Sequence, residues 1–345
     1  MNTNILQIEI HQIKGISSLK IKLPLNPGVY AITGINGIGK STLLSAIAPR
    51  LVRPINFSIL RNFEYLDNSF ISYTIGKITE KWQPTKESRN WVCSIDPTLK
   101  LRGFQEGTIT KGTRFLNSSS YLSYKKLQQA KSEHLLLADD FVTENLGFIL
   151  HNNKNHYTNL YRIDHNKAKN HYSYDGVPYF LKTNNRILSY FDLSTGEFLL
   201  INLLHLLNNL LVRTENREKL NMILIDEVEL ALHPSAIKRL VQFMKDISQK
   251  YSVSIYFSTH SLEIINALHI DNLFYLKQFS DKSIICENPC YPAYITRDIY
   301  SHSGYDIIIL VEDDLAKSIV NSFINKLKLN KNKRIQILPV GGYEN

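Results

Sequence analysis

The chain has 345 residues, a formal net charge of +9, 43% hydrophobic residues and 21% charged residues. This balance allows one large or two ordinary globular domains and excludes a fibrous or mainly disordered chain. The three cysteines are too few for a disulfide framework. No apolar run reaches the roughly 20 residues that span a bilayer, and the N-terminus does not resemble a secretion signal. We therefore expect a cytoplasmic protein without a membrane partner.

The positive excess favours an anionic partner, and nucleic acid is the natural candidate. Two stretches interleave basic residues, which could neutralise phosphates, with tyrosines, which could stack on bases. Neither stretch contains a recognisable motif, so a solvated surface with core tyrosines remains an open alternative. The stretches consist of Lys111, Arg114, Tyr121, Tyr124, Lys125 and Lys126, and of Tyr157, Tyr161, Arg162, His165, Lys167, Lys169 and Tyr172.

The first elements follow from hydrophobic periodicity. Apolar residues alternate in residues 6–10 and 19–23, which predicts two half-buried antiparallel strands. Residues 28–33 are more continuously apolar and predict a third strand. A glycine-rich loop follows, and then a helix that should run from Ser41 to about Pro49.

The middle of the chain is less regular, and the part after it is clearer. We expect residues 57–183 to form a helical or irregular second lobe, with short strands and one helix over residues 124–140. From residue 186 onwards, helices alternate with buried strands, which indicates an α/β fold with a parallel sheet covered on both faces. The predicted elements there are a helix at 195–212, strands at 222–225 and 253–257, and helices after Pro234 and Ser261.

The loop at residues 34–41 fits the pattern GxxxxGK[ST] at every fixed position. Glycines let successive backbone N–H groups turn towards phosphates, and the helix that follows adds its positive N-terminal end. Lys40 should reach the β- and γ-phosphates of ATP, and Ser41 should bind Mg²⁺. The residues expected at the nucleotide are Gly34, Asn36, Gly37, Gly39, Lys40, Ser41 and Thr42.

Two acids, Asp226 and Glu227, directly follow the buried strand at residues 222–225. A strand that ends in Asp places the carboxylate at the carboxyl edge of a parallel sheet, beside the phosphate loop. Asp226 is therefore the expected Mg²⁺ ligand. Glu227 is the expected base that orients and deprotonates the attacking water.

Two further segments carry candidate residues. Ser194 and Glu197 form a capping box at the start of a helix, and this helix N-terminus, with Ser194 and Gly196, is also suited to a γ-phosphate. His260 follows the strand at 253–257, where it can sense the γ-phosphate and help position the water.

Four features follow one another along the chain: the phosphate loop, the segment at Ser194, the acid pair and His260. Together they resemble an ABC-type ATPase head of the RecF/SMC-like and OLD-like group over most of residues 1–300. The run from Asp226 to Pro234 is similar to the DEPExxLHP run of that group, with Val228 in place of its proline. The resemblance implies a head-to-tail dimer in which Ser194 and Gly196 act on the partner's ATP. It also implies a Q-loop glutamine, for which Gln83 and Gln105 are weak candidates.

Residues 301–345 resemble the start of a Toprim domain. The strand that ends at Glu312 and the turn at Gly341 carry this resemblance, whereas Asp313 and Ala316 depart from it. A two-metal nuclease needs several acids around two cations, and this segment offers too few of them. We therefore assign no nuclease activity to the chain alone, and the segment is either degenerate or partial.

These observations lead to one main expectation and two alternatives. We expect an ATPase that dimerises on ATP and controls a nucleic-acid-directed effector, such as a nuclease partner in antiphage defence, although the defence role rests on family analogy. A RecF-like DNA-repair ATPase would carry the same site. A transporter ATPase subunit is the third alternative, and the run Leu232-His233-Pro234 and the positive charge argue against it.

Overall fold

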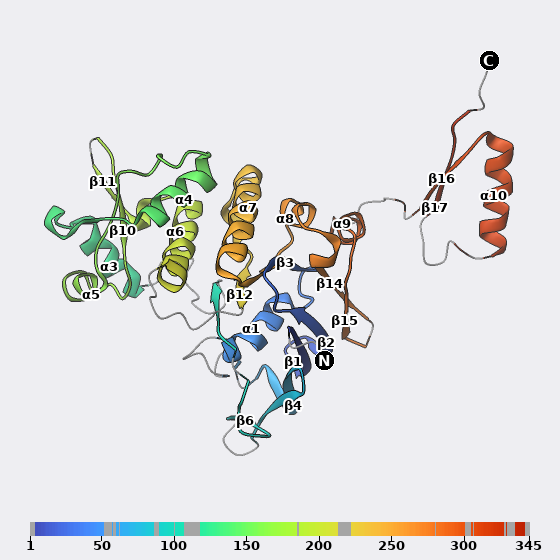
Figure 1. Ribbon diagram of the computed structural model, residues 1–345, viewed down its shortest axis with the longest axis horizontal. Coiled ribbons are helices and arrows are strands. Elements are labelled where there is room, and N and C mark those ends of the chain that lie inside the picture. Colours follow the sequence, from blue (N-terminus) through green and yellow to red (C-terminus); the bar gives the residue numbers. More distant parts are fainter. Residues whose placement is uncertain are drawn as a thin grey trace. The chain divides into compact units, whose positions relative to one another are not determined.

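The computed structural model describes residues 4–51, 57, 60–61, 63–85, 90–99, 101–106, 118–184, 186–212, 222–279, 281–300, 305, 307–327, 329 and 335–341. The chain divides into two compact units, Met1–Cys290 and Tyr291–Asn345 (Figure 1). The domain boundary that we expect at residue 300 falls inside the second of these units. The linker expected at residues 301–304 lies outside the described residues.

The first unit is built on an 11-stranded mixed sheet with the order β6-β5-β4-β1-β2-β15-β14-β3-β13-β12-β7. Strands β14, β3, β13, β12 and β7 pair in parallel, whereas β6, β5, β4, β1 and β2 pair antiparallel. The fold is therefore α/β with N-terminal antiparallel strands, as expected. The strands are β1 (Ile5–Ile13), β2 (Ile16–Pro24), β3 (Gly28–Thr33), β4 (Tyr65–Ile75), β5 (Ile78–Pro84), β6 (Trp91–Cys93), β7 (Gly103–Glu106), β12 (Met222–Asp226), β13 (Ser254–Ser258), β14 (Leu273–Gln278) and β15 (Ser283–Glu287).

Helices cover both faces of the parallel strands. Side chains alternate between the faces, and Met222 and Leu224 of β12 belong to the core that α1 (Lys40–Leu51) shares with β1, β2 and β4. The intervening side chains are also fully buried, and α7 (Pro234–Tyr251) packs on β3 and β13. A shorter helix, α8 (Leu262–Ala267), follows β13. Helix α1 includes Pro49 and extends to Leu51, two residues beyond the predicted end.

The segment expected as an irregular lobe, residues 57–183, is divided between two structures. Strands β4 to β7 belong to the main sheet, and only the part after residue 118 forms a lobe, around a sheet of order β11-β10-β9-β8. Helix α4 joins this lobe to the head, because it packs on α6 and α7 (Figure 1). The lobe comprises α3 (Ser118–Gln128), β8 (Leu136–Leu137), α4 (Asp140–His151), β9 (Leu160–Arg162), α5 (His165–Tyr172), β10 (Tyr179–Lys182) and β11 (Ile187–Ser189), and α6 (Thr195–Leu207) follows it.

The helix expected over residues 124–140 is wrong. Helix α3 ends at Gln128, and Leu136 and Leu137 pair with Arg162 and Tyr161 of β9 instead of continuing a helix. Tertiary pairing has overridden a weak local preference for helix. The two ends of the expected helix therefore lie in different elements, α3 and α4.

One helical stretch in the described chain, Thr195–Val212, is long and apolar enough to cross a membrane, with a mean hydropathy of 1.3. It consists of α6 and a π-helical turn over Asn208–Val212. In this protein 44% of the stretch is buried, and α6 packs against α4 and the turn after β12. The stretch therefore serves as a core helix of the head.

The second unit holds α9 (Pro292–Tyr300), β16 (Ile307–Val311), α10 (Asp314–Lys326) and β17 (Ile335–Pro339). Strands β16 and β17 are parallel and joined through α10, as the sequence predicts. Asp313, one of the departures from the Toprim pattern, caps α10, because its side chain accepts a 2.7 Å hydrogen bond from the Ala316 N–H. Glu312 is exposed at the end of β16, and its carbonyl accepts a 3.0 Å hydrogen bond from the Gly341 N–H.

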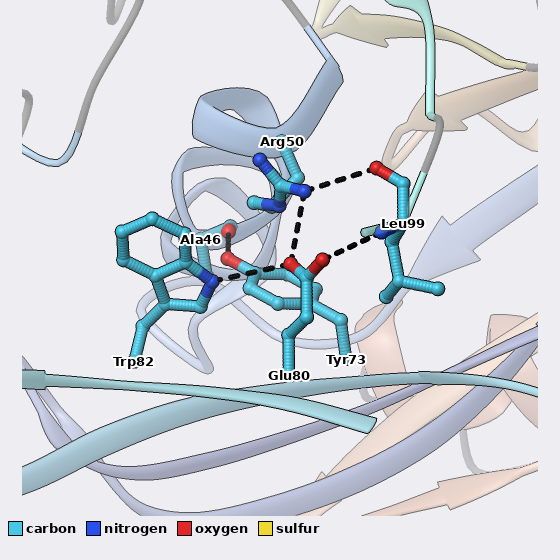
Figure 2. A network of polar contacts seen from close by, with 6 residues as sticks. All are labelled: Ala46, Arg50, Tyr73, Glu80, Trp82 and Leu99. Carbon is cyan, nitrogen blue, oxygen red and sulfur yellow. Dashed lines mark hydrogen bonds and ion pairs between the residues drawn. The ribbon is translucent and has the colours of Figure 1, made fainter. Parts of the chain in front are cut away.

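A buried ion pair ties the end of α1 to the antiparallel strands (Figure 2). Arg50 Nη2 lies 2.9 Å from Glu80 Oε2, and the Glu80 side chain is fully buried. The second carboxylate oxygen accepts a 2.6 Å hydrogen bond from the Leu99 N–H, and Arg50 donates to the Leu99 carbonyl at 3.0 Å. Trp82 Nε1 also donates to Glu80, and Tyr73 donates to the Ala46 carbonyl. The phosphate-loop helix is thereby fixed to the segment that leads into β7.

We expect Glu80→Ala to lower the free energy of unfolding by about 3–5 kcal/mol, because it leaves Arg50, whose side chain is only 16% exposed, without its counter-charge. Urea unfolding followed by tryptophan fluorescence measures this locally, since both tryptophans, Trp82 and Trp91, lie in β5 and β6. Glu133→Ala is the control, because the Glu133–Lys131 pair is 3.8 Å long and about 70% exposed on both sides and should change little. Equal effects of the two substitutions would contradict the prediction.

Candidate nucleotide site

The glycine-rich loop joins β3 to α1. Gly34 has φ 154° and Gly39 has φ 107°, a backbone region that side-chain-bearing residues rarely adopt. A Cβ atom at Gly34 would lie 2.7 Å from the Leu276 carbonyl oxygen, and one at Gly39 would lie 2.9 Å from the Ile16 side chain. Both glycines are therefore required by the local backbone and by the space around it.

The Lys40 side chain is buried and folds back over this loop. Its Nζ donates to the carbonyls of Gly34 at 3.1 Å and Ile35 at 3.2 Å, and it lies 2.6 Å from His260 Nε2. Burial lowers the pKa of Lys40 to about 8, against the opposing effect of three nearby acids, Glu227, Asp226 and Glu229. The Lys40 ammonium group is thus hydrogen-bonded to two carbonyl oxygens and close to a ring nitrogen. Phosphate oxygens could accept the same hydrogen bonds in their place.

Ser41 and Asp226 meet at the first turn of α1. Ser41 Oγ donates to Asp226 Oδ1 at 3.4 Å, and Asp226 is the last residue of β12. Burial raises the pKa of Asp226, and the charge of Glu227 acts in the same direction. A hydroxyl and a carboxylate are the oxygen ligands that a phosphate-bound Mg²⁺ uses, and a cation would relieve the crowded negative charge. Within the described ranges no three His, Cys, Asp or Glu residues form a metal cage.

Glu227 occupies a strained position at the end of β12. Its backbone is left-handed, with φ 48° and ψ 42°, which costs a non-glycine residue about 1–3 kcal/mol. Its N–H donates to the Ser258 carbonyl at 3.0 Å, which holds this turn against β13. The strain is concentrated at the residue that the sequence predicts to be the base.

His260 lies at the end of β13, where a residue without an assigned role supports it. Glu229 Oε1 accepts from Thr259 Oγ1 at 2.6 Å and from the His260 N–H at 2.9 Å. Burial lowers the pKa of His260 to about 4, and the Lys40 charge adds to this, so the ring is neutral at neutral pH. The sequence alone gave Glu229 no role. The signal that could have identified it is its place as the third acid in residues 226–229.

The segment Ser194–Glu197, which we term the signature segment, begins α6. Ser194 is the N-cap: its Oγ accepts from the Glu197 N–H at 3.3 Å, and its own N–H donates to Glu197 Oε2 at 2.8 Å. Gly196 is buried, and a Cβ there would lie 2.7 Å from the Ala231 carbonyl oxygen. No hydrogen bond that the described part of the chain shows joins Ser194 to residues 34–42. Ser194 itself is exposed.

The structure places the residues of the two basic–aromatic stretches in different surroundings. Tyr157 and Tyr172 are buried, at 2% and 5% exposure, which agrees with the alternative that these tyrosines belong to the core of the lobe. Lys169 and His165 of α5 are exposed, but both lie against Asp175. In the first stretch, Lys125 and Lys126 are exposed and Tyr124 is half-buried, whereas Lys111, Arg114 and the Tyr121 side chain lie outside the described residues.

The Q-loop candidates lie in opposite halves of the sheet. Gln83 lies on β5, opposite Val92 in the antiparallel half. Gln105 lies on β7, which runs parallel to β12 and pairs Gln105 with Leu224, two residues before Asp226. Gln105 is therefore the candidate on the strand beside the acids.

Residues 89–266 match the family described as "AAA domain, putative AbiEii toxin, Type IV TA system". The match covers more than half of the chain and includes the signature segment, both acids and His260, whereas the phosphate loop precedes it. No curated protein matches the chain.

Among solved structures, the chain is similar in fold to an SMC head bound to the C-winged helix domain of ScpA, with 15% identity, a TM-score of 0.51, and 82% of this chain and 96% of that chain covered. The SMC head domain from Thermotoga maritima has 13% identity, coverages of 84% and 99%, and a TM-score of 0.43. An Smc head with an extended coiled coil, derived from Pyrococcus furiosus, has 10% identity, coverages of 94% and 99%, and a TM-score of 0.49. The first similarity supports the fold, and the other two are too loose to support an inference.

We expect ATP affinity to fall about tenfold between pH 7 and pH 9, because the pKa of Lys40 is about 8 and binding above that pH must return a proton to Lys40. The charged form dominates at pH 7 and the neutral form at pH 9. Titration of a fluorescent ATP analogue at these two pH values measures the change. Lys40→Arg, which stays charged at both values, should flatten the dependence; an unchanged affinity in the parent protein would contradict the role of Lys40.

Proposed function

The chain belongs to the family described as AAA domain, putative AbiEii toxin, type IV toxin–antitoxin system, and we propose that it binds ATP with Mg²⁺ and hydrolyses the ATP. Its family and its SMC-head-like fold make it an ABC-type P-loop ATPase. The observation that carries the proposal is the meeting of Lys40, Ser41, Asp226 and His260 at one edge of the sheet. There, Ser41 and Asp226 are 3.4 Å apart, and Lys40 and His260 are 2.6 Å apart.

Each residue has a distinct role in this proposal. The N–H groups of the loop around Asn36, Gly37 and Gly39 hold the phosphates, and Thr42 binds an α-phosphate oxygen. Lys40 moves away from His260 and donates to the β- and γ-phosphates. The phosphate oxygens then replace the His260 nitrogen as hydrogen-bond acceptors. Ser41 and Asp226 would hold Mg²⁺, which supplies charge neutralisation at the phosphates.

Hydrolysis requires a water molecule in line with the γ-phosphate. Glu227 would orient this water and take its proton, and the left-handed turn at Glu227 fixes where the side chain begins. His260, neutral and held through its N–H by Glu229, can accept or donate a hydrogen bond at the γ-phosphate. ATP and water give ADP and phosphate, and the proton leaves through Glu227.

We further propose that two heads form a head-to-tail dimer, or a higher oligomer built from it, on ATP. In this arrangement Ser194 and Gly196 of one head face the γ-phosphate bound by the other. Support comes from the exposed Ser194 at a helix N-terminus, which favours anions.

The proposed setting is cytoplasmic control of a nucleic-acid-directed effector, such as a nuclease partner, in antiphage defence. The family description, which names a putative toxin of a toxin–antitoxin system, supports this setting. The Toprim-like resemblance of the β16–α10–β17 segment is part of the proposal, and its exposed Glu312 is the acid a cation would use. A RecF-like repair ATPase remains the alternative, and a preference for DNA structures over an effector protein would identify it.

We expect Glu227→Gln to bind ATP with near-parental affinity but to hydrolyse it at least about 100-fold more slowly, since proton transfer contributes about 10²–10⁴-fold. The variant should also accumulate as an ATP-bound dimer. Turnover and size-exclusion chromatography with light scattering measure both effects. Lys40→Ala is the matched variant that should lose ATP binding itself. Parental turnover in Glu227→Gln would remove Glu227 as the base.

We expect Ser194→Arg to abolish the ATP-dependent dimer and turnover while leaving ATP binding to the variant's own loop intact, because a bulky side chain at the helix N-terminus blocks the second head. The assay mixes each variant with ATP and compares sedimentation velocity and phosphate release. Ser132→Arg, at another exposed serine in the lobe, controls for added bulk and charge. A dimer and turnover that survive Ser194→Arg would exclude the role in trans.

A further inference from the structure

The signature serine is the first member of a chain of hydrogen bonds that runs into the lobe. Ser194 Oγ donates to Glu197 Oε2 at 2.7 Å, and the other carboxylate oxygen, Oε1, accepts from the Tyr157 hydroxyl at 2.7 Å. His151 Nε2 lies 3.0 Å from the same tyrosine oxygen. Residues from α4, from the segment before β9 and from α6 are thereby connected.

This arrangement exceeds what a helix cap requires. A capping box needs only the bonds between each residue's side chain and the other's N–H, and Ser194 and Glu197 already make both. The bond from Tyr157 is additional, and this tyrosine is only 2% exposed. A buried hydroxyl aimed at a carboxylate 40 residues away in sequence therefore needs another reason.

The charge of Glu197 determines which way the Ser194 proton points. Burial raises the pKa of Glu197, but the hydrogen bonds from Ser194 and Tyr157 outweigh it and the net shift is downward. An ionised carboxylate can only accept, so the Ser194 proton points to Glu197. An approaching phosphate then meets a lone pair of Ser194 Oγ, and the hydroxyl must turn before it can donate.

The bond from Tyr157 makes that turn less costly. When the Ser194 hydroxyl turns away from Glu197, the carboxylate still accepts from two donors, the Ser194 N–H and the Tyr157 hydroxyl. Without Tyr157, one carboxylate oxygen would lose its protein donor, and the carboxylate would hold the serine proton more tightly. A half-buried charge with an unmet hydrogen bond is costly.

We propose that Tyr157 is a positioning residue for the signature serine, which it frees to donate to the γ-phosphate bound by a second copy of this chain. The inference rests on the trans role proposed for Ser194. Helix α4 carries His151, which contacts the tyrosine hydroxyl, and α4 is fixed to α7, because Arg239 of α7 donates to the carbonyls of Ile149 and Leu150 at 2.7 Å and 2.9 Å.

The test compares Tyr157→Phe with Tyr179→Phe, both made in the slow Glu227→Gln protein. Tyr179 is the matched control, because it is 1% exposed and its hydroxyl bonds to α6 at the other end of the helix, 2.8 Å from His205 Nδ1. Sedimentation velocity measures ATP-dependent association, and an ATP analogue titration measures binding to each chain's own loop. We expect Tyr157→Phe to weaken association about tenfold, the loss of one hydrogen bond to a charged group, with unchanged ATP binding. Tyr179→Phe should change neither.

A second variant separates positioning from folding. Glu197→Gln removes the charge that holds the Ser194 proton, so it should associate at least as tightly as the parent, and Tyr157→Phe should have little further effect in that background. The proposal is overturned if Tyr157→Phe associates like the parent, or if Glu197→Gln alone weakens association tenfold. If the Glu227→Gln parent itself does not associate on ATP, the trans arrangement falls and the role of Tyr157 falls with it.

Discussion

Ser258 of β13 lies opposite Asp226 of β12 on one side and opposite Ile32 of β3 on the other, and this register is the constraint on which the site depends. Parallel strands in a fixed register end together, so the chain leaves all three at the same edge. The phosphate loop, the acids and His260 are therefore brought together by the backbone of the three strands. A slip of one residue would turn Asp226 to the opposite face of the sheet.

The electrostatics of this edge suit a ligand that brings both signs of charge. Three acids and one lysine share a mostly buried region, and burial disfavours the charged form of Lys40, Asp226 and Glu229 alike. A nucleotide with its cation offers the lysine an anion and the aspartate a metal. Nearby groups hold the reactive side chains in the meantime, since carbonyls and His260 accept from Lys40, and Ser41 donates to Asp226.

Local patterns were sufficient for the strands and loops that surround the site. The strand at 28–33, the helix after it, and the buried strands before Asp226 and His260 were predicted to within one or two residues, because both faces of these strands are covered. The sequence failed where pairing partners are distant. Strand β4 pairs with β1 across roughly 60 residues of chain, and β5 and β6 join the sheet through β4. No local pattern reveals these pairings, nor the pairing of residues 136–137 with β9.

The same limit explains two side chains whose supporting roles the sequence does not show. Glu229 holds the backbone of His260 from 31 residues away, and Tyr157 bonds to a carboxylate 40 residues away. Sequence spacing gave Glu229 no role and left both base stacking and a core position open for Tyr157. Lys40, Ser41 and Asp226 each lie in a short contiguous motif, so the sequence alone proposes a role for them. Supporting residues are recognised only from the folded structure.

Gly196 approaches the Ala231 carbonyl so closely that no larger residue fits without displacement. Ala231 ends the short turn that begins at Glu227, so the start of α6 rests directly on the segment that follows the acids. In the paired arrangement we propose, each subunit would therefore touch one nucleotide with its acids and the other with its serine, through a single rigid contact. The two sites would then not hydrolyse ATP independently. A structural change at one site would be transmitted to the other, and the pair would behave as one kinetic unit.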